Sequence, residues 1–210
     1  MGLGRDSMDE ELQDMLMQPA IVVHQQVELS NVLIGIDSGN KYSLHSPTGQ
    51  QLGQSAEVGG VGGFLMRQIF RNARSANVKL FGNKGTEIAE IRKPFKFIFS
   101  EVAATIGGAE VGRAKRTSWI GRNYTISVMG VPTFTISSSL FQWKNFRFNV
   151  MKNGVHVATI MKRYEGAIKM VFTQADTFTL EFHDTSLSLE ERFTLLGTTY
   201  LIDFDCFEQK

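Results

Sequence analysis

The feature that most constrains the fold of this chain is a helix-length apolar segment from Ser188 to Phe207. Ser188 followed by Glu191 is a capping box, which marks the start of a helix. A membrane-spanning helix needs about 20 apolar residues, whereas the uncharged run here extends only from Phe193 to Ile202. The segment therefore predicts a helix over residues 188–207 that is buried in the protein. The side chains expected to face the core are Phe193, Leu195, Leu196, Tyr200, Leu201 and Phe204.

The composition limits both the size of the core and the chemistry. With 210 residues, 42% of them apolar and 16 of them Phe, the chain is long enough to bury a substantial core. Its single cysteine, Cys206, excludes an intrachain disulfide framework and a cysteine-rich metal site. The histidines lie in no metal-binding spacing, and the sequence has neither a nucleophile elbow nor a phosphate-binding loop. These absences predict that the protein is not an enzyme.

Short strands separated by glycine turns recur along the chain. Gly49 and Gly85 each lie between two such strands, and Asn153–Gly154 is the strongest local signal for a hairpin. Successive hairpins predict an antiparallel meander, which removes its exposed edges by closing into a barrel. We therefore expect a single, mainly β domain over residues 20–208, a closed barrel that encloses the C-terminal helix. Residues 1–19 are expected to be an acidic lead-in, either a short helix around Asp9–Met17 or disordered.

The net charge of +1 conceals an uneven distribution. Residues 67–122 hold twelve basic and four acidic side chains, whereas residues 175–208 hold one basic and eight acidic side chains. A basic section can face anionic lipid or nucleic acid, or it can pair with the acidic end of the same domain. The near-neutral total charge and the lack of a DNA-reading motif argue against nucleic acid.

Three basic clusters in this section are candidates for binding anionic lipid. Phe95 and Phe97 are interleaved with the second cluster, and Trp119 lies close to the third. Each basic side chain near an anionic leaflet contributes about 1 kcal/mol, so binding of phosphoinositide or phosphatidylserine has a physical basis. The alternative is solubilising charge on outward strand faces. The clusters are Arg67, Arg71 and Arg74; Arg92, Lys93 and Lys96; and Arg113, Lys115, Arg116 and Arg122.

Several motifs carry a resemblance to a known family. Val23–Leu29 reads Val-His-Gln-Gln-Val-Glu-Leu and Tyr200–Phe204 reads Tyr-Leu-Ile-Asp-Phe; with Phe172–Phe178 they resemble, in order, the phospholipid scramblase family. The resemblance implies a tubby-like closed β-barrel wrapped around a hydrophobic C-terminal helix. It also implies Ca²⁺-stimulated, bidirectional movement of phospholipids between membrane leaflets, which breaks no covalent bond. Related tubby-like and LURP-one-like barrels are binding proteins or regulators. The alternative is therefore a soluble adaptor that binds phosphoinositide, another anionic lipid or a protein partner and moves no lipid.

The same resemblance implies that the protein is cytoplasmic and peripheral on the plasma membrane or on the membrane of an organelle. The nucleus is the alternative location. Family members with clear membrane attachment carry palmitoylated cysteines in the region corresponding to about Phe97–Gly107, and a Pro-rich N-terminal extension. This sequence shows neither feature. Weaker anchoring is expected, because stable attachment usually takes two signals.

The family's proposed Ca²⁺ loop precedes the last helix. On this chain the resemblance places Asp176 in that loop, with Glu181 and Asp184 close in sequence, as candidate Ca²⁺ ligands. Calcium takes about six to eight oxygen ligands, and only one acidic residue falls at an expected position. The segment Phe178–Phe182 also alternates as a strand does. A weak Ca²⁺ site and a β-strand with an acidic edge are the two interpretations.

Overall fold

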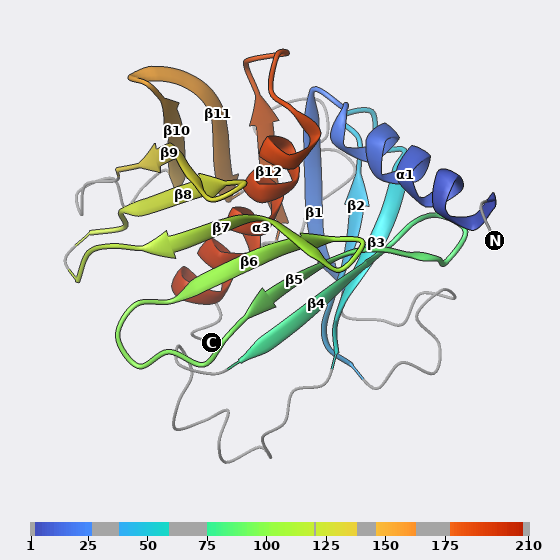
Figure 1. The fold of residues 1–210 in the computed structure, drawn as a ribbon, viewed down its shortest axis with the longest axis horizontal. Coiled ribbons are helices and arrows are strands. Elements are labelled where there is room, and N and C mark those ends of the chain that lie inside the picture. The colour runs from blue at the N-terminus through green and yellow to red at the C-terminus, as the bar shows by residue number, and fades with distance from the viewer. Residues whose placement is uncertain are drawn as a thin grey trace.

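A computed structural model describes residues 3–26, 38–58, 75–119, 121–137, 146–162 and 177–207. These residues form two helices and twelve strands (Figure 1). The helices are α1 (Leu3–Leu16) and α3 (Leu189–Cys206). The strands are β1 (Ala20–Gln26), β2 (Ser38–His45), β3 (Gln51–Val58), β4 (Ala76–Phe81), β5 (Glu87–Lys93), β6 (Glu101–Ile106), β7 (Ala109–Arg116), β8 (Tyr124–Val128), β9 (Val131–Ile136), β10 (Arg147–Lys152), β11 (Val155–Lys162) and β12 (Thr177–Phe182).

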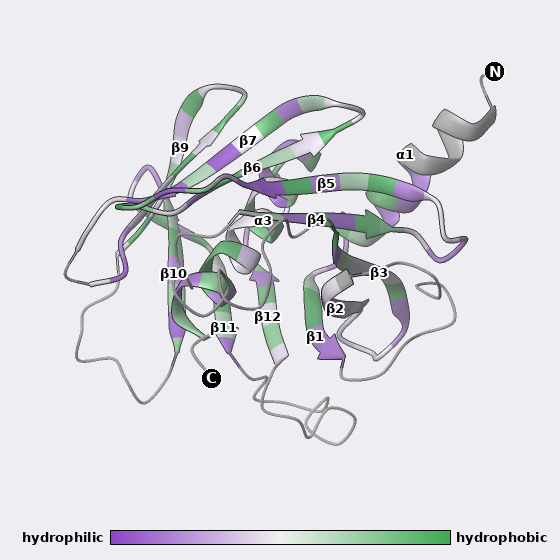
Figure 2. Cartoon of the chain, turned by 90° about the horizontal axis from the view of Figure 1, so that it is seen from below, coloured by the Kyte–Doolittle hydropathy of each residue, from purple (hydrophilic) through white to green (hydrophobic). Residues whose placement is uncertain are grey.

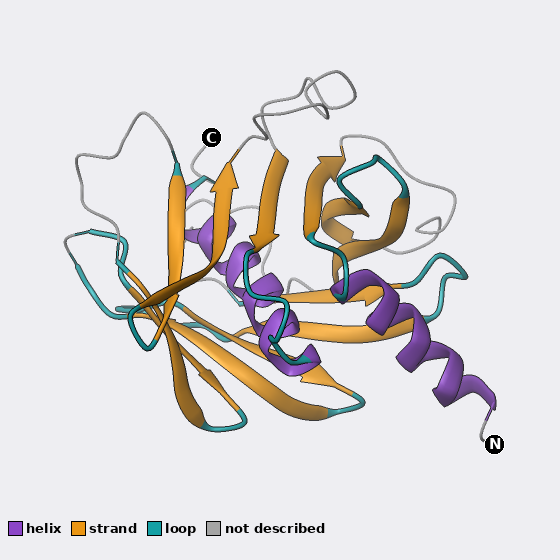
Figure 3. Ribbon diagram, turned by 90° about the horizontal axis from the view of Figure 1, so that it is seen from above, coloured by secondary structure: helices purple, strands orange, loops and turns teal. Residues whose placement is uncertain are grey.

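The strands form a closed antiparallel barrel. Each strand pairs with its neighbours in sequence, and β1 pairs with β12 to complete the ring. In this closing pair Ile21 lies opposite Leu180 and Val23 opposite Phe178, and all four side chains are buried. Hydrophobic and hydrophilic residues are interleaved along the strands (Figure 2), as expected where one face lies on a core. The predicted closed barrel around a C-terminal helix is confirmed, and Figure 3 shows α3 running through it.

The two ends of the barrel differ in their connections. At one end, here named the hairpin end, tight turns join the strands. Asn153 and Gly154 have φ angles of 51° and 79°, the left-handed conformation that a two-residue hairpin turn requires. Met129 and Gly130 adopt the same conformation between β8 and β9. At the opposite end, here named the loop end, residues 94–100 join β5 to β6 and residues 117–123 join β7 to β8.

Helix α3 fills the interior of the barrel. It begins at the expected capping box: the Ser188 hydroxyl accepts from the Glu191 amide (3.2 Å), and the Glu191 carboxylate accepts from the Ser188 amide (2.9 Å). All six side chains predicted to face the core are at most 2% exposed. The helix packs mainly against β6, β7 and β8. A Cβ atom at Gly112 of β7 would collide with Thr194, so glycine permits this close approach.

Helix α1 lies at the hairpin end. It spans Leu3–Leu16 and so begins earlier than the segment Asp9–Met17 in which a helix was expected. Leu12, Met15 and Leu16 are at most 1% exposed and belong to the same hydrophobic core as α3 and the strands. The acidic N-terminal segment therefore contributes side chains to the core of the barrel.

Candidate functional site

The candidate lipid-binding residues that can be placed gather on β5, the 94–100 loop and β7. Both strands pair with β6, which brings the second and third basic clusters together. Arg92, Lys96, Arg113 and Lys115 are exposed, and Arg92 pairs with Glu90 of the same strand (2.5 Å). The first cluster lies outside the described residues; it comprises Arg67, Arg71 and Arg74.

Lys93 does not belong to this surface. It is 3% exposed, and the alternation along β5 turns it inward together with Ile91, opposite Ala76 of β4. The prediction that Lys93 contacts lipid was wrong, because consecutive residues of a strand point to opposite faces. Inside the barrel its positive charge acts to lower the pKa of Asp205, although burial raises that pKa more strongly.

Glutamates neutralise part of the exposed cluster. Arg113 pairs with Glu110 (2.6 Å) and with Glu101 (2.9 Å), and Lys96 also reaches Glu101 (3.3 Å). The hydrogen bond with Glu110 is the main reason that the pKa of Arg113 is raised. The net positive charge of this surface is therefore smaller than the run of basic residues in the sequence indicates.

Arg116 organises the loop that follows β7. Its guanidinium donates to the carbonyl oxygens of Ser118 (3.1 Å) and Gly121 (3.2 Å). Its backbone amide donates to the carbonyl of Ser100 (2.9 Å), which ends the neighbouring 94–100 loop. Arg122, also in this loop, lies over the ring of Phe207, the residue that follows α3. The guanidinium of Arg116 therefore donates hydrogen bonds within the protein, and its backbone amide links the two loops.

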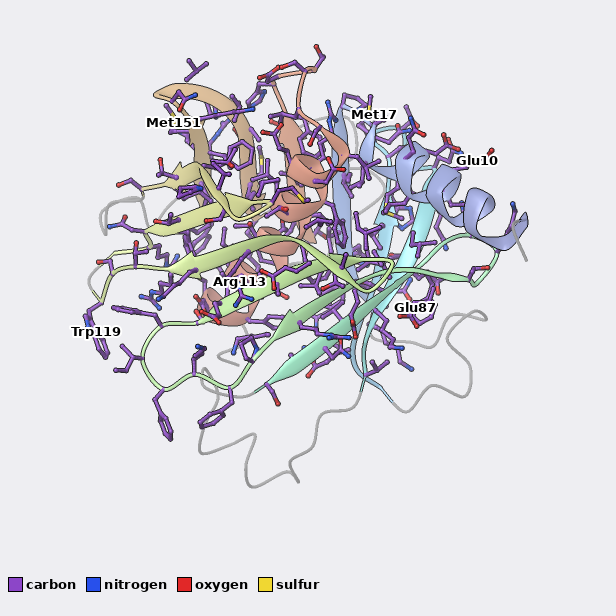
Figure 4. All side chains as sticks on the ribbon, viewed as in Figure 1. Glu10, Met17, Glu87, Arg113, Trp119 and Met151 are labelled. Carbon is purple, nitrogen blue, oxygen red and sulfur yellow. The ribbon has the colours of Figure 1, made fainter. Side chains whose placement is uncertain are left out.

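The same two loops expose large apolar side chains. Phe97 is 75% exposed, Trp119 70%, Ile98 62% and Phe95 43%. The rings of Phe95 and Phe97 meet edge to face with centroids 4.7 Å apart, and Phe99 contacts Trp119 across the two loops at 5.2 Å. Figure 4 shows Trp119 at the margin of the molecule, on the side away from α1. These five residues are named the aromatic loop pair.

Two acidic residues anchor α3 at the loop end. Asp205 accepts hydrogen bonds from the hydroxyls of Ser100 (2.5 Å) and Tyr124 (3.4 Å), and Asp203 accepts one from Tyr42 (2.9 Å). Burial raises the pKa of Asp205, while its hydrogen bonds act in the opposite direction. The sequence presented these two acids only as interruptions of an apolar run. Their spacing of two residues near the end of a buried helix is the signal that could have identified them as anchors.

A buried cation holds α3 at the hairpin end. Arg192 is 3% exposed, and its guanidinium donates to the carbonyls of Leu16 (2.9 Å), Gln18 (3.2 Å) and Leu187 (3.2 Å). Burial lowers the pKa of this guanidinium. The last carbonyls of a helix lack partners within the helix and favour a cation. Arg192 therefore joins α3 to the end of α1, a contact between distant parts of the chain that no local pattern indicates.

Polar groups in the middle of α3 also have partners. The hydroxyls of Thr198 and Thr199 donate to the backbone carbonyls four residues earlier, at 2.8 and 3.1 Å. The Tyr200 hydroxyl lies 2.6 Å from that of Ser55 on β3, and burial is the main reason that its pKa is raised. The helix is thus bonded to the barrel wall as well as packed against it. No helix among the described residues has the length and apolar character that crossing a membrane requires.

The candidate Ca²⁺ ligands are only partly placed. Asp176 lies outside the described residues, Glu181 is on β12, and Asp184 follows that strand. The carboxylate of Asp184 accepts from the hydroxyl (2.6 Å) and amide (2.8 Å) of Ser186, which lowers its pKa. The described part of the chain contains no group of three His, Cys, Asp or Glu residues that could hold a metal ion.

The fold and the site define a closed β-barrel protein that is built around a buried C-terminal helix and displays basic and aromatic loops at one end. A family model described as Scramblase matches residues 5–209. The chain belongs to the scramblase family.

Curated relatives match over most of the chain. A phospholipid scramblase family protein of Schizosaccharomyces pombe is 24% identical, and the match covers 93% of this chain and 61% of the relative. Phospholipid scramblase 2 of Bos taurus is 26% identical over 90% of this chain and 68% of its own length. The chain thus spans about two thirds of the length of these relatives or less. A solved protein of Arabidopsis thaliana is 12% identical, with a TM-score of 0.47 over 90% of this chain and 92% of its own.

Proposed function

We propose that this protein binds anionic phospholipid at the cytoplasmic surface of a membrane, with the loop end of the barrel toward the lipid. The observation that carries the proposal is the uneven charge of the two ends. Exposed Lys96 and Lys115 lie at the loop end, whereas the acidic helix α1 lies at the hairpin end. An anionic leaflet attracts the first surface and repels the second. Relatives named phospholipid scramblases support phospholipid as the ligand.

Bidirectional movement of phospholipids between leaflets is the second candidate function, since relatives of this chain carry the name phospholipid scramblase. The lumen of the barrel is filled by α3, which is bonded to the wall through Tyr200, Asp203 and Asp205. Lipid movement by this chain would therefore follow the outside of the barrel while α3 stays in place. An adaptor that binds lipid and a protein partner, without moving lipid, is the alternative.

Binding of Ca²⁺ is a separate part of the proposal. Asp184 is a partly exposed carboxylate shortly before α3, and Glu181 lies three residues before it on β12. In the proposal Glu181 and Asp184 are the ligands of a weak Ca²⁺ site whose occupation adds positive charge to the protein. The extended strand β12, about 20 Å long, separates Asp184 from the position of Asp176 in the sequence, so Asp176 is not a ligand of the same site. Replacing Asp184 by Asn should then abolish any difference that Ca²⁺ makes to lipid binding, because the site would lose one of its few charged ligands.

The experiment that tests the proposal is co-sedimentation of the purified protein with vesicles of phosphatidylcholine, with and without phosphatidylserine. We expect sedimentation only with phosphatidylserine and a decrease at high salt, because exposed charges are screened. The double variant Lys96→Gln/Lys115→Gln should lose about tenfold or more in affinity. Lys84→Gln is the matched control, since Lys84 is exposed at the other end of β5. Equal binding to both vesicles, or no loss in the double variant, would contradict the proposal.

A parallel measurement separates lipid movement from the adaptor function. Exchange of a fluorescent phospholipid between leaflets is recorded on the same vesicles, with and without Ca²⁺. Exchange by the wild-type protein assigns lipid movement to this chain. Sedimentation without exchange assigns the adaptor function instead. A change with Ca²⁺ that persists in Asp184→Asn would contradict the proposed Ca²⁺ site.

A further inference from the structure

The loop end carries more apolar surface than lipid attraction by charge requires. We propose that the aromatic loop pair inserts into the interfacial layer of a phospholipid bilayer and adds to the affinity that the basic side chains provide. The inference rests on the proposed function and identifies the part of the protein that enters the lipid. The residues assigned to the inserted surface are Phe95, Phe97, Ile98 and Trp119, with Phe99 behind them.

Exposure and grouping together distinguish these side chains. Four large apolar side chains, each between 43% and 75% exposed, lie on two loops that touch each other through Phe99 and Trp119. Contiguous exposed apolar surface on a folded protein marks an interaction site, whereas single exposed apolar side chains are ordinary. Among the exposed apolar residues at the other end of the barrel, Met129 and Val131 share the turn between β8 and β9, and Val155 lies at a different turn, between β10 and β11.

The chemistry of the side chains suits the interface of a bilayer. Aromatic residues are enriched where membrane meets water, because a flat ring buries a large apolar area and indole also offers a polar N–H group. Phe97 and Trp119, the two most exposed of the set, are both aromatic. Their rings can therefore leave water without entering the centre of the bilayer.

Charge complementarity favours the same end of the barrel. Lys96 lies between Phe95 and Phe97, and Lys115 lies on the strand that leads to Trp119. Basic side chains beside inserted rings would meet lipid phosphates when the rings enter the interface. The hairpin end displays Glu10 and Glu87 instead, on the side away from Trp119 (Figure 4). At the loop end the exposed apolar side chains and the lysines lie on the same two loops and on strand β7 between them.

The two loops are held in place before any lipid binds. Arg116 fixes the 117–123 loop through Ser118 and Gly121, and its amide is bonded to Ser100 at the end of the other loop. Ser100 is bonded in turn to Asp205 of α3. The exposed rings therefore lie on loops that hydrogen bonds already hold in place, so the loss of loop entropy on binding is small.

The test uses Trp119 as its own reporter. Trp143, which lies outside the described residues, is replaced by Phe, so that Trp119 is the single tryptophan of the chain. The protein is mixed with phosphatidylcholine–phosphatidylserine vesicles whose acyl chains carry bromine near the headgroup. We expect the fluorescence of Trp119 to shift to the blue and to be quenched by these lipids. A protein that sediments with the vesicles while Trp119 stays unquenched would overturn the inference and leave the proposed function intact.

A pair of variants measures the contribution to affinity. Phe97→Ser/Ile98→Ser should lower vesicle affinity by about tenfold or more, because two large apolar groups no longer leave water. Val131→Ser, an equally exposed apolar residue at the hairpin end, should bind within about twofold of the wild-type protein. Thermal unfolding checks that the variants are folded. Equal binding of the double variant and the wild type would overturn the inference. A wild-type protein that binds no vesicle would overturn the proposed function and the inference together, and would favour a protein partner for these loops.

Discussion

The hairpin end and the loop end both hold α3, but with opposite charges. At the hairpin end the buried guanidinium of Arg192 lies near the start of α3, and at the loop end Asp203 and Asp205 lie near its finish. A helix dipole favours acids at the start and bases at the finish; Glu190 and Glu191 in the first turn follow this preference, but the buried charges do not. Each charge instead bonds a partner outside the helix: Arg192 donates to the carbonyl of Leu16 at the end of α1, and the aspartates accept from hydroxyls of Tyr42 and Ser100.

The two ends also differ in what they offer to the surroundings. Turns and α1 complete the hairpin end with the protein's own groups, and its surface is acidic. The loop end presents the aromatic loop pair and lysines to the outside. Among the described residues, side chains of the protein itself hold α3 at both ends, and exposed aromatic side chains lie beside lysines at the loop end.

The largest expected effect tests the packed interior that both ends share. Replacing Leu196 by Asp should unfold the barrel, because a buried unpaired charge costs several kcal/mol. Val155→Asp is the control, since Val155 is an apolar residue that is 62% exposed. Urea denaturation followed by circular dichroism measures both variants. A Leu196→Asp variant that is folded and as stable as the control would show that α3 does not need to stay in the lumen.

The next effect tests the hairpin end alone. Arg192→Met should reduce the free energy of unfolding by about 2–3 kcal/mol, because the carbonyls of Leu16 and Gln18 lose their buried donor. Arg147→Met, at an exposed arginine of β10, should change it little. Urea denaturation gives the difference, and limited proteolysis shows whether α1 detaches first. If the two variants are equally stable, Arg192 does not hold the two helices together.

A smaller effect tests the start of α3. Ser188→Ala removes the acceptor of the capping box and should cost about 1 kcal/mol. Thr185→Ala, at an exposed residue of the preceding loop, is the matched control. Both are compared in urea. A cost for Ser188→Ala no larger than that for Thr185→Ala would mean that the packing of α3, and not its cap, determines where the helix begins.

The smallest effect compares the two ends through pH. The pKa of Asp205 is raised by burial, so its contribution to stability is largest below the pKa of the unfolded chain and is lost as the pH rises through the folded pKa. The pKa of Asp184, at the hairpin end, is lowered by Ser186, so its contribution is present above the unfolded pKa and is lost as the pH falls. From pH 7 to pH 4 the wild type should gain stability relative to Asp205→Asn, and below pH 4 it should lose stability relative to Asp184→Asn. Denaturation curves across these ranges that move in the same direction for both variants would contradict the assignment.

Much of the fold could be predicted from local patterns. The capping box at Ser188 and the apolar run after it identified α3 and its buried side chains, and Asn153–Gly154 identified a hairpin turn. These features are local, because a cap or a two-residue turn is determined by residues a few positions apart. Closure of the barrel followed from the number of hairpins, since an open meander would leave edges exposed.

The candidate site was less predictable, because its properties depend on pairing between strands. The pairing of β6 with β7 brings Arg113 beside Glu101 and so reduces the positive charge that the sequence indicated. The same pairing brings Phe99 to Trp119. The sequence alone could have excluded Lys93 from the lipid-binding surface, since Lys93 shares the inward face of β5 with Ile91. The bond from Arg192 to Leu16 joins residues too far apart in sequence for any pattern to reveal.

The order of elements along the chain has a consequence for how the protein is made. The helix that fills the barrel follows all twelve strands, and β12, which closes the ring against β1, is the last strand to be synthesised. Until α3 leaves the ribosome, the nascent strands have an empty interior and two unpaired edges. Folding of the barrel must therefore wait for the end of α3, and contacts over such sequence distances form slowly. A newly made chain would need protection from aggregation during that interval, and a ribosome stalled before Ser188 would hold strands that lack the side chains of α3.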